Sequence, residues 1–326
     1  MVSTKTKVDV TDAKEEDLTA LREDVRRGLT SRPRFLPPKY FYDRKGTRLF
    51  EAITRLPEYY LARAEMAILR ERADEIVAVA RPTDFIELGP GASEKTRLIL
   101  DAMARAGTLE NFLPLDISSD ALERIVLDLS RGYKTLRIQG LAGDFARTLD
   151  RIPQGGRRLI AFLGSTIGNL DRQDAISLMR RISHLLKKDD LFLLGTDLVK
   201  PAPVLEAAYN DTAGITARFN RNILRVINRR LGADFRPGLF DHHAFFNADL
   251  SRIEMHLRAR RSHTVRIADL EMAVAFEAGE LLHTENSYKY TREVITLMLR
   301  DAGLELRRWL VDERSIFALS LSGTTP

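Results

Sequence analysis

Short apolar runs alternate with longer segments of helical spacing through much of the first 200 residues. The short runs, which predict strands, are residues 84–88, 112–116, 135–139, 159–163 and 191–195. The longer segments, which predict helices, are residues 61–80, 95–106, 119–130 and 174–186. Repeated strand and helix in this order is typical of an α/β fold with a parallel, doubly wound sheet. We therefore assign residues 61–200 to such a core.

Residues 201–286 break this rhythm. The segment 216–231 is rich in arginine and asparagine and has helical spacing. The segments 244–246, 253–258 and 264–267 alternate in a way that suits an antiparallel sheet. This pattern predicts an inserted α+β lobe. A helix at 291–302 and strands at 304–311 and 315–321 follow, so we predict that residues 287–326 return to the core.

Residues 1–60 are assigned to an N-terminal segment that contributes to the inserted lobe. Residues 1–30 are largely polar and charged, which predicts irregular structure up to a helix near residues 17–29. Three prolines, at positions 33, 37 and 38, then interrupt regular structure. Proline has this effect because it fixes φ and lacks a backbone donor.

The composition narrows the class of protein. With 44% apolar and 30% charged residues, the chain of 326 residues supports a substantial core and is not a small stapled module. The lack of cysteine excludes disulfide frameworks, thiolate zinc sites and cysteine nucleophiles. The sequence has no run of 18 apolar residues and no apolar signal region at its start, so we expect a cytoplasmic protein without a membrane partner. We also expect a monomer, and the net charge of +5 allows an anionic ligand without requiring one.

A glycine turn, Gly89-Pro90-Gly91-Ala92-Ser93-Glu94-Lys95-Thr96, follows the first strand of the core. Loops that bind nucleoside triphosphates or dinucleotides place glycine where this chain has Glu94, which argues against both ligands. S-adenosylmethionine has no phosphate and needs close backbone approach here, with a carboxylate after the next strand for its ribose. Asp116 meets that need, and Gly143-Asp144-Phe145 offers a carboxylate and an amide for adenine. These three strand ends predict an S-adenosylmethionine site.

Further motifs accompany this turn. They are Phe41-Tyr42-Asp43, Leu56-Pro57-Glu58-Tyr59-Tyr60, Gly164-Ser165-Thr166-Ile167-Gly168-Asn169, Gly195-Thr196-Asp197-Leu198-Val199-Lys200 and Phe219-Asn220-Arg221-Asn222. From around residue 32 onward, the chain resembles the L-histidine Nα-methyltransferase family of ergothioneine biosynthesis. The resemblance implies a Rossmann-like class I methyltransferase sheet with an inserted substrate-binding lobe. It also implies transfer of three methyl groups from S-adenosylmethionine to the α-amine of L-histidine, which gives hercynine.

The resemblance also carries residue roles onto this sequence. The cofactor-binding set is Tyr42, Phe50, Gly89, Lys95, Asp116, Asp144 and Phe145. The substrate-binding set is Tyr59, Gly164, Asn169, Tyr209, Met255, Glu285, Asn286 and Ser287. In this set Glu285 and Ser287 take the imidazole, while Asn286 and the neighbouring His283 adjust selectivity. Tyr42 and Asn169 are the candidate catalytic residues, as acceptors of a hydrogen bond or proton from an amine that must be neutral to react.

Structural interpretations of these residues stay open beside the functional ones. Tyr59 is also typical of a half-buried packing tyrosine, Asn169 of a helix N-cap, and Glu285 of a solvated strand residue. The six histidines show no convincing metal-ligand spacing, so we predict no metal.

Other functions also stay open. Arginines at 218, 221, 225, 229, 230, 258, 260 and 261 could form a basic surface for RNA, as in a nucleic-acid methyltransferase. The aromatic and basic pattern of single-strand binders is missing and a solvated helix face explains the charges, so we expect no nucleic-acid partner. The remaining alternatives are an enzyme for another aromatic amino acid and a non-catalytic module that senses S-adenosylmethionine.

Overall fold

The structure, a computed structural model, describes residues 6–9, 13–91, 93–144 and 148–325 and divides into two compact units. Unit 1 contains the described parts of Met1–Thr11, Leu61–Val199 and Tyr288–Pro326. Unit 2 contains the described parts of Asp12–Tyr60 together with Lys200–Ser287. The chain therefore passes between the units four times, after residues 11, 60, 199 and 287.

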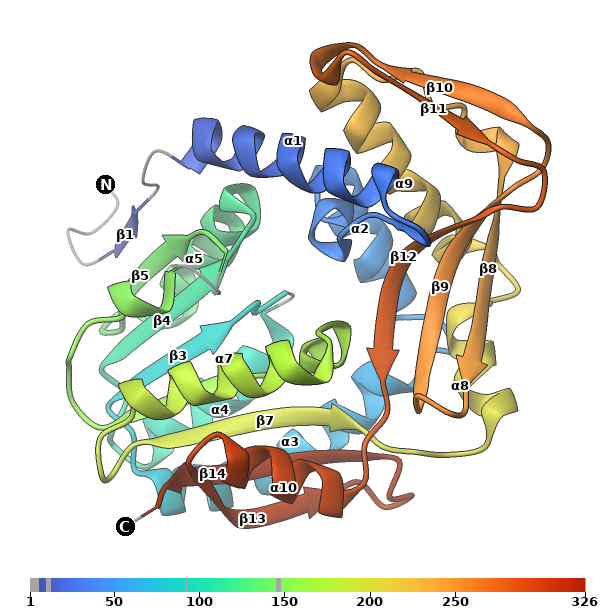
Figure 1. The fold of residues 1–326 in the computed structure, drawn as a ribbon. Helices are drawn as coiled ribbons and strands as arrows, with labels where there is room; N and C mark the ends of the chain where they lie inside the picture. The colour runs from blue at the N-terminus through green and yellow to red at the C-terminus, as the bar shows by residue number, and fades with distance from the viewer. Residues whose placement is uncertain (1–5, 10–12, 92, 145–147, 326) are drawn as a thin grey trace. The chain divides into compact units, whose positions relative to one another are not determined.

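Unit 1 is built on an eight-stranded sheet in the order β1-β5-β4-β3-β6-β7-β14-β13 (Figure 1). Its strands are β1 (Thr6–Asp9), β3 (Asp84–Leu88), β4 (Asn111–Asp116), β5 (Arg137–Ala142), β6 (Arg158–Phe162), β7 (Leu191–Asp197), β13 (Leu304–Val311) and β14 (Phe317–Thr324). All neighbours from β1 to β7 are parallel, and β14 is antiparallel to β7 and β13. The predicted doubly wound α/β sheet and final hairpin are confirmed, although the strand predicted at 135–139 lies at Arg137–Ala142.

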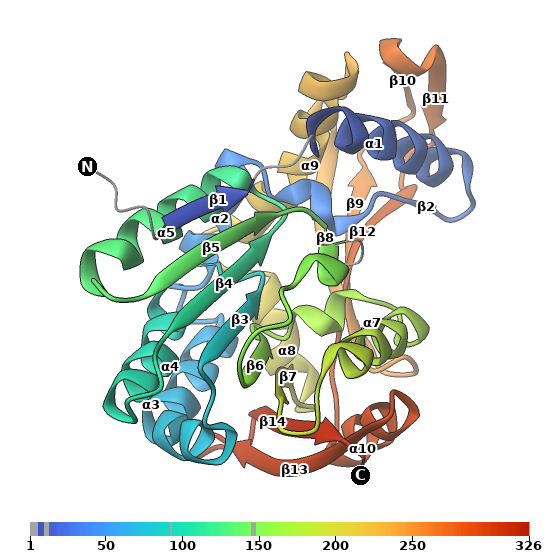
Figure 2. The same cartoon turned by 90° about the vertical axis from the view of Figure 1, so that its left-hand side faces the viewer.

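Helices cover both faces of this sheet. They are α3 (Tyr60–Ala80), α4 (Glu94–Arg105), α5 (Ser119–Gly132), α7 (Arg172–Leu185) and α10 (Arg292–Asp301), with short η2 (Leu149–Arg151) and η3 (Thr166–Asn169). Figure 2 shows α3, α4 and α5 on one face and α7 and α10 on the other. Every residue of β6 and β7 is buried, as expected for strands covered on both sides. No helix of the described residues is long and apolar enough to cross a membrane.

The N-terminus departs from the prediction of irregular structure before the first helix. Residues Thr6–Asp9 form β1, which is parallel to β5 with Thr6 opposite Ile138 and Asp9 opposite Leu141. An edge strand forms backbone hydrogen bonds to the free edge of its neighbour and needs no apolar run of its own. The hydrophobic pattern therefore gave no signal for β1.

The topology of unit 1 has a switch point at β3. From β3 the chain adds β4 and β5 on one side, and it then returns to add β6 and β7 on the other side. In open α/β sheets, ligands bind outside the carboxyl ends of the strands at such a point. The glycine turn follows β3 and Gly164 follows β6, so both lie at this edge.

Unit 2 combines a four-stranded sheet, in the order β2-β12-β9-β8, with a separate two-stranded ribbon. Its strands are β2 (Arg34–Phe35), β8 (Phe240–Asn247), β9 (Arg252–Ala259), β10 (His263–Ile267), β11 (Met272–Phe276) and β12 (Leu281–Tyr288, whose last residue is in unit 1). Its helices are α1 (Ala13–Thr30), α2 (Arg44–Ile53), α8 (Ala202–Tyr209) and α9 (Ile215–Leu231), with short η1 (Pro38–Phe41), η4 (Pro237–Leu239) and η5 (Ala268–Leu270). The prediction that 264–267 joins the same sheet as 244–246 and 253–258 was wrong. This segment, β10, pairs with β11 instead.

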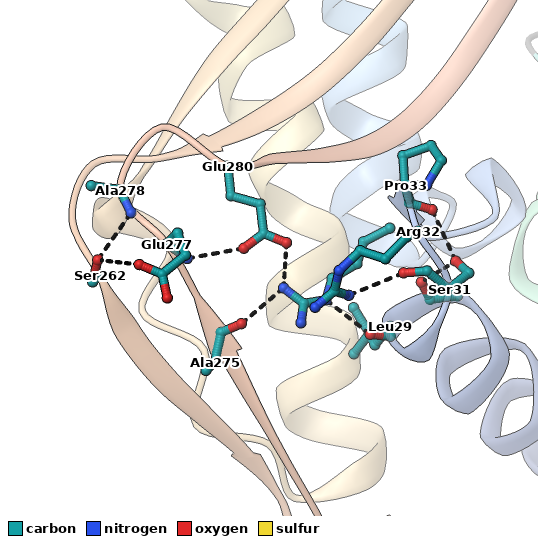
Figure 3. Close-up of polar contacts among 11 residues, drawn as sticks. Leu29, Ser31, Arg32, Pro33, Ser262, Ala275, Glu277, Ala278 and Glu280 are labelled. Atoms are coloured by element: carbon teal, nitrogen blue, oxygen red, sulfur yellow. Dashed lines mark hydrogen bonds and ion pairs between the residues drawn. The ribbon is translucent and has the colours of Figure 1, made fainter.

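Arg34 ties the N-terminal part of unit 2 to the inserted part. Its buried guanidinium donates to the carbonyl oxygens of Leu29 (2.9 Å) and Ala275 (2.8 Å) and forms an ion pair with Glu280. The guanidinium also lies 4.8 Å from the ring centroid of Phe276. Figure 3 shows the polar contacts around Leu29, Ala275 and Glu280. A buried charge with this many partners fixes its neighbours in place, because loss of Glu280 would leave the charge without a counter-ion.

Candidate active site

The glycine turn after β3 has the backbone that a close ligand approach requires. Gly89 and Gly91 have φ values of 64° and 59°, in the left-handed region that glycine adopts at little cost. The Gly89 amide donates to the Leu115 carbonyl at 2.8 Å, which joins the turn to the end of β4. A Cβ atom on either glycine would meet no atom of the described residues within 4 Å. The space above the turn is therefore open to a ligand.

Asp116 ends β4 beside this turn. Burial raises the pKa of its carboxyl to about 6, although hydrogen bonds from the backbone amides of Ser118 and Ile117 act in the opposite direction. The Ser118 amide donates to Asp116 Oδ1 at 2.9 Å, and the Gly143 amide donates to the Asp116 carbonyl at 2.9 Å. The second bond joins the ends of β4 and β5. The structure thus places the three predicted strand ends at Gly89, Asp116 and Gly143 side by side.

Asp144 follows Gly143, and its backbone is fixed by Thr148. The hydroxyl and amide of Thr148 both donate to the Asp144 carbonyl, at 2.8 and 2.9 Å. Gly143 has a φ of 152°, and a Cβ atom there would lie 2.4 Å from Thr148 Oγ1. Glycine is therefore required at this position for two reasons: other residues rarely adopt this φ value, and a side chain would clash with Thr148. The predicted cofactor residue Phe145 lies outside the described residues.

Lys95 stands in the first turn of α4 and contacts a residue that the sequence analysis did not identify. Its Nζ lies 2.7 Å from Oε2 of Glu65, whose side chain is fully buried. The other oxygen of Glu65 accepts a hydrogen bond from the Gly164 amide at 2.7 Å. Glu65 thus contacts one residue predicted to bind cofactor and another predicted to bind substrate.

Asn169 ends η3, the short helix after β6. The N-cap of α7 is Asp171, two residues later, so the alternative interpretation of Asn169 as that cap is wrong. η3 is fixed from two sides. Ser165 Oγ accepts from the Asp197 amide at 2.9 Å, and a Cβ atom at Gly168 would lie 3.0 Å from the Tyr288 carbonyl oxygen.

In unit 2, the predicted aromatic residues form one cluster around Phe219 of α9. The ring centroid of Phe219 lies 5.7 Å from that of Tyr42 and 5.9 Å from that of Phe50. Phe50 lies 6.3 Å from Tyr59, and Tyr59 lies 6.3 Å from Tyr209. We call these five residues the aromatic cluster. Phe219 belongs to one of the motifs in the sequence but is not among the predicted site residues. Its helical spacing is the same as that of a core residue, so the sequence does not distinguish the two roles.

The imidazole-binding candidates lie on β12 beside this cluster. Ser287 Oγ lies 2.7 Å from the Tyr209 hydroxyl oxygen, so the structure brings these two predicted substrate residues together. Glu285 is only 7% exposed, which makes its alternative interpretation as a solvated strand residue wrong. Met255, on β9, is 1% exposed, and its carbonyl accepts from the Thr284 hydroxyl at 3.0 Å.

A buried amide positions this part of the sheet. Asn220 of α9 donates to the His256 carbonyl (3.0 Å) and to His242 Nδ1 (2.9 Å), and it accepts from the Thr284 hydroxyl at 2.8 Å. An amide nitrogen can only donate, so His242 Nδ1 is the acceptor. His242 Nε2 therefore carries the hydrogen that it donates to the Tyr209 carbonyl at 2.8 Å. This network links α9, β8, β12 and the end of α8, and sequence patterns give no sign of it.

β12 departs from strict alternation near its centre. Thr284 and Ser287 both bond to helices on one face of the sheet, although residues three apart on a regular strand face opposite sides. His283 Nε2 likewise lies 2.8 Å from Asn286 Oδ1. Thr284 with Ser287, and His283 with Asn286, each indicate one extra residue between the two members of the pair, as in a β-bulge. The bulge places Asn286 with His283, on the face opposite to Ser287.

The described residues contain no group of three or more His, Asp or Glu side chains that could hold a metal ion.

Comparisons with known proteins agree with this geometry. Residues 21–324 match the family described as histidine-specific, S-adenosylmethionine-dependent methyltransferases. The histidine N-alpha-methyltransferase of Mycolicibacterium smegmatis is 48% identical over 93% of this chain and 94% of its own length. Its counterpart of the same name in Mycobacterium tuberculosis is 46% identical over the same shares. Ergothioneine biosynthesis protein 1 of Schizosaccharomyces pombe is 32% identical over 78% of this chain and 34% of its own length. The chain therefore belongs to the family of histidine-specific, S-adenosylmethionine-dependent methyltransferases.

Proposed function

We propose that this enzyme transfers three methyl groups to the α-amine of L-histidine and forms hercynine, the first step of ergothioneine biosynthesis. The observation that carries the proposal is the pair of buried polar residues Glu285 and Ser287, which stand two positions apart on β12. Of the two, Ser287 is bonded to the Tyr209 hydroxyl. A buried carboxylate beside a buried hydroxyl suits a ring that has one N–H and one further nitrogen. The names of the M. smegmatis and M. tuberculosis relatives support the same substrate.

The glycine turn and the two strand ends beside it suit S-adenosylmethionine, which supplies an electrophilic methyl group when bound. The open space at Gly89 and Gly91 allows the close backbone approach that this molecule needs. Asp116 would accept hydrogen bonds from both ribose hydroxyls, and Asp144 would accept from the adenine amino group. The ammonium of Lys95 would pair with the carboxylate of the amino-acid part.

The substrate residues would hold histidine by its polar groups. Tyr59, Asn169 and Tyr209, with the backbone of Gly164, would bind the α-carboxylate and amine. Glu285 would accept the imidazole N–H, and Ser287 would contact the other ring nitrogen with Met255 packed beside the ring. An amino acid without that N–H would lose this charge-assisted hydrogen bond and should therefore bind less tightly.

The amine must lose its proton before it reacts, because only the neutral form has a free lone pair. Tyr42 and Asn169 are the proposed acceptors of its hydrogen bond or proton. Positioning is the remaining demand, since the lone pair must approach the methyl carbon opposite the leaving sulfur. The aromatic cluster would stabilise the trimethylammonium product through its ring faces. Phe219 adds a further ring to those of Tyr42, Phe50 and Tyr59 in this role.

The direct test is incubation of the purified protein with S-adenosylmethionine and each of the twenty amino acids, read by mass spectrometry. Histidine that gains one, two and three methyl groups, with S-adenosylhomocysteine formed in step, is the expected result. Methylation of another aromatic amino acid in preference to histidine would reject the substrate assignment. Donor binding without turnover on any amino acid would support the sensor alternative.

Replacement of Glu285 tests the imidazole assignment. Glu285→Gln keeps the size of the side chain but removes its charge, so kcat/KM for histidine should fall by about tenfold or more. The KM for S-adenosylmethionine should stay within about twofold, because Glu285 is assigned to the substrate alone. Glu305→Gln, on the exposed side of β13, is the matched control and should retain full activity. Unchanged histidine kinetics in Glu285→Gln would remove this residue from the site.

A further inference from the structure

Glu65 is a fully buried carboxylate in the third helix, and each of its oxygens has a different partner. Oε2 lies 2.7 Å from the ammonium nitrogen of Lys95, whose side chain is 20% exposed. Oε1 accepts from the backbone amide of Gly164 at 2.7 Å. A Cβ atom at Gly164 would lie 3.6 Å from Lys95 Nζ, so the three groups form one compact cluster.

Packing does not explain a carboxylate at this position. Its neighbours on α3, such as Ile68 and Leu69, are buried apolar residues, and an apolar side chain would fill the same space. Taking a carboxylate out of water is unfavourable unless its partners are well placed. The fold also makes room for it. A Cβ atom at Gly195 of β7 would lie 2.3 Å from Glu65 Oε1, so only glycine leaves this oxygen in its place.

The two partners of Glu65 lie in the segments that follow β3 and β6, the neighbouring strands at the switch point. Lys95 lies six residues after Gly89, in the first turn of the helix that follows β3. Gly164 lies two residues after the end of β6 and has a φ of 75°. Neither residue has a fixed position by itself, since one is a long flexible side chain and the other a loop backbone. A single rigid carboxylate on a helix fixes the positions of both.

We propose that Glu65 is a positioning residue that sets the place of the Lys95 ammonium for the methyl donor and of the Gly164 amide for the acceptor substrate. The proposal rests on the proposed function for the roles of those two partners. The carboxylate restricts Lys95 to one direction and keeps the Gly164 amide aligned through the left-handed turn. A single substitution that removes the charge of Glu65 would therefore weaken the binding of both the methyl donor and the acceptor substrate.

Glu65→Gln tests this proposal. In one orientation, the amide oxygen of the glutamine accepts from the Gly164 amide, but the NH₂ group cannot pair with the Lys95 ammonium. In the other orientation, the oxygen accepts from the ammonium, but the NH₂ group cannot accept from the Gly164 amide. The expected result is a Kd for S-adenosylhomocysteine, measured by calorimetry, that rises about tenfold, and a KM for histidine that also rises. Gly195→Ala should have the same direction of effect, because it displaces the carboxylate with its charge intact. Glu305→Gln should change neither constant.

A double-mutant cycle separates positioning from a general loss of structure. With Lys95→Met as background, Glu65→Gln should no longer change the affinity for S-adenosylhomocysteine, since the side chain it positions is gone. A general structural loss would weaken binding equally in both backgrounds, would lower the melting temperature in parallel, and would overturn the proposal. Unchanged affinity in the single variant Glu65→Gln would overturn it as well. Because S-adenosylhomocysteine binding needs no acceptor, these results stand apart from a failure of the histidine assignment, which the amino-acid panel alone reports.

Discussion

In the proposed donor site, Asp116 accepts hydrogen bonds from the ribose, so its ionisation state should affect donor binding. A ribose hydroxyl donates well to a carboxylate and poorly to a carboxylic acid, so binding requires the ionised form. Burial raises the pKa of this group to about 6. Donor affinity should therefore be constant above pH 7 and fall as the pH drops through 6. The Kd for S-adenosylhomocysteine at pH 5 should exceed that at pH 7 by about tenfold, as follows from the protonated fraction.

Calorimetric titration at several pH values measures this change. Asp116→Asn cannot ionise and should bind weakly at both pH values, with the pH dependence removed. A wild-type Kd that stays flat between pH 5 and 7 would contradict the assignment of Asp116 to the ribose. Comparison with Asp116→Asn also shows whether another group produces the dependence.

Single residues were the hardest feature to predict from sequence. The strand-end residues Gly89 and Asp116 follow apolar runs, so the hydrophobic pattern alone is enough to place them at one edge of the sheet. Glu65 was missed because a charged residue among helical apolar positions normally faces solvent, and its burial depends on Lys95 and Gly164 from distant segments. Phe219 was missed for the opposite reason, since a buried aromatic residue on a helix is usually part of the core.

At the scale of elements, helix α9 is bonded to β12, the strand that carries Glu285 and Ser287. Asn220 of α9 has three hydrogen-bond partners, one each on β8, β9 and β12. Asn220→Leu would remove all three of these hydrogen bonds, so the free energy of unfolding should fall by about 3 kcal/mol. Thr284→Val removes one of the bonds and should cost about 1 kcal/mol.

Urea unfolding of the two variants measures these costs, and the KM for histidine reports the position of β12. The larger loss of stability should come with the larger rise in KM. Equal stability of Asn220→Leu and wild type would show that the network does not hold the bulge in place.

Strands whose two faces are both covered were predicted well, and strands at the edge of a sheet were not. The central strands β3, β4, β6 and β7 have continuous apolar runs because both faces are covered, and this signal survives in the sequence. β1 has no such run, since its stability depends on the edge of β5. The pairing of β10 with β11 instead of the main sheet is set by tertiary contacts that alternation alone cannot specify.

At the scale of the whole molecule, Glu87 makes stability depend on pH. Burial raises the pKa of this fully buried residue to about 7 from its ordinary value of 4.5, and Glu65 acts in the same direction, while Thr96 and Lys95 act against them. Its Oε1 has no hydrogen-bond partner among the described residues. The folded protein therefore keeps this proton at pH values where the unfolded chain has lost it. As a result, this group makes stability fall as the pH rises from about 4.5 to 7, by roughly 3 kcal/mol in total.

Glu87→Gln stays neutral at every pH and should lose this component of the pH dependence. The measurement is the free energy of unfolding in urea at pH 5, 6 and 7 for wild type and variant. The difference between them should grow in favour of the variant as the pH rises. A difference that stays constant across this range would show that Glu87 ionises normally in the folded protein.

The four passages of the chain between the units have a consequence for how the protein is made. Arg34 and Glu280, partners in unit 2, are 246 positions apart. A nascent chain therefore carries α1, β2 and α2 for most of its synthesis before β12 leaves the ribosome. In unit 1, the edge of β7 likewise stays unpaired until β14 (Phe317–Thr324) has been synthesised. Neither unit can complete its sheet before β12 and β14 have been synthesised, so apolar surface of the incomplete chain stays exposed until then.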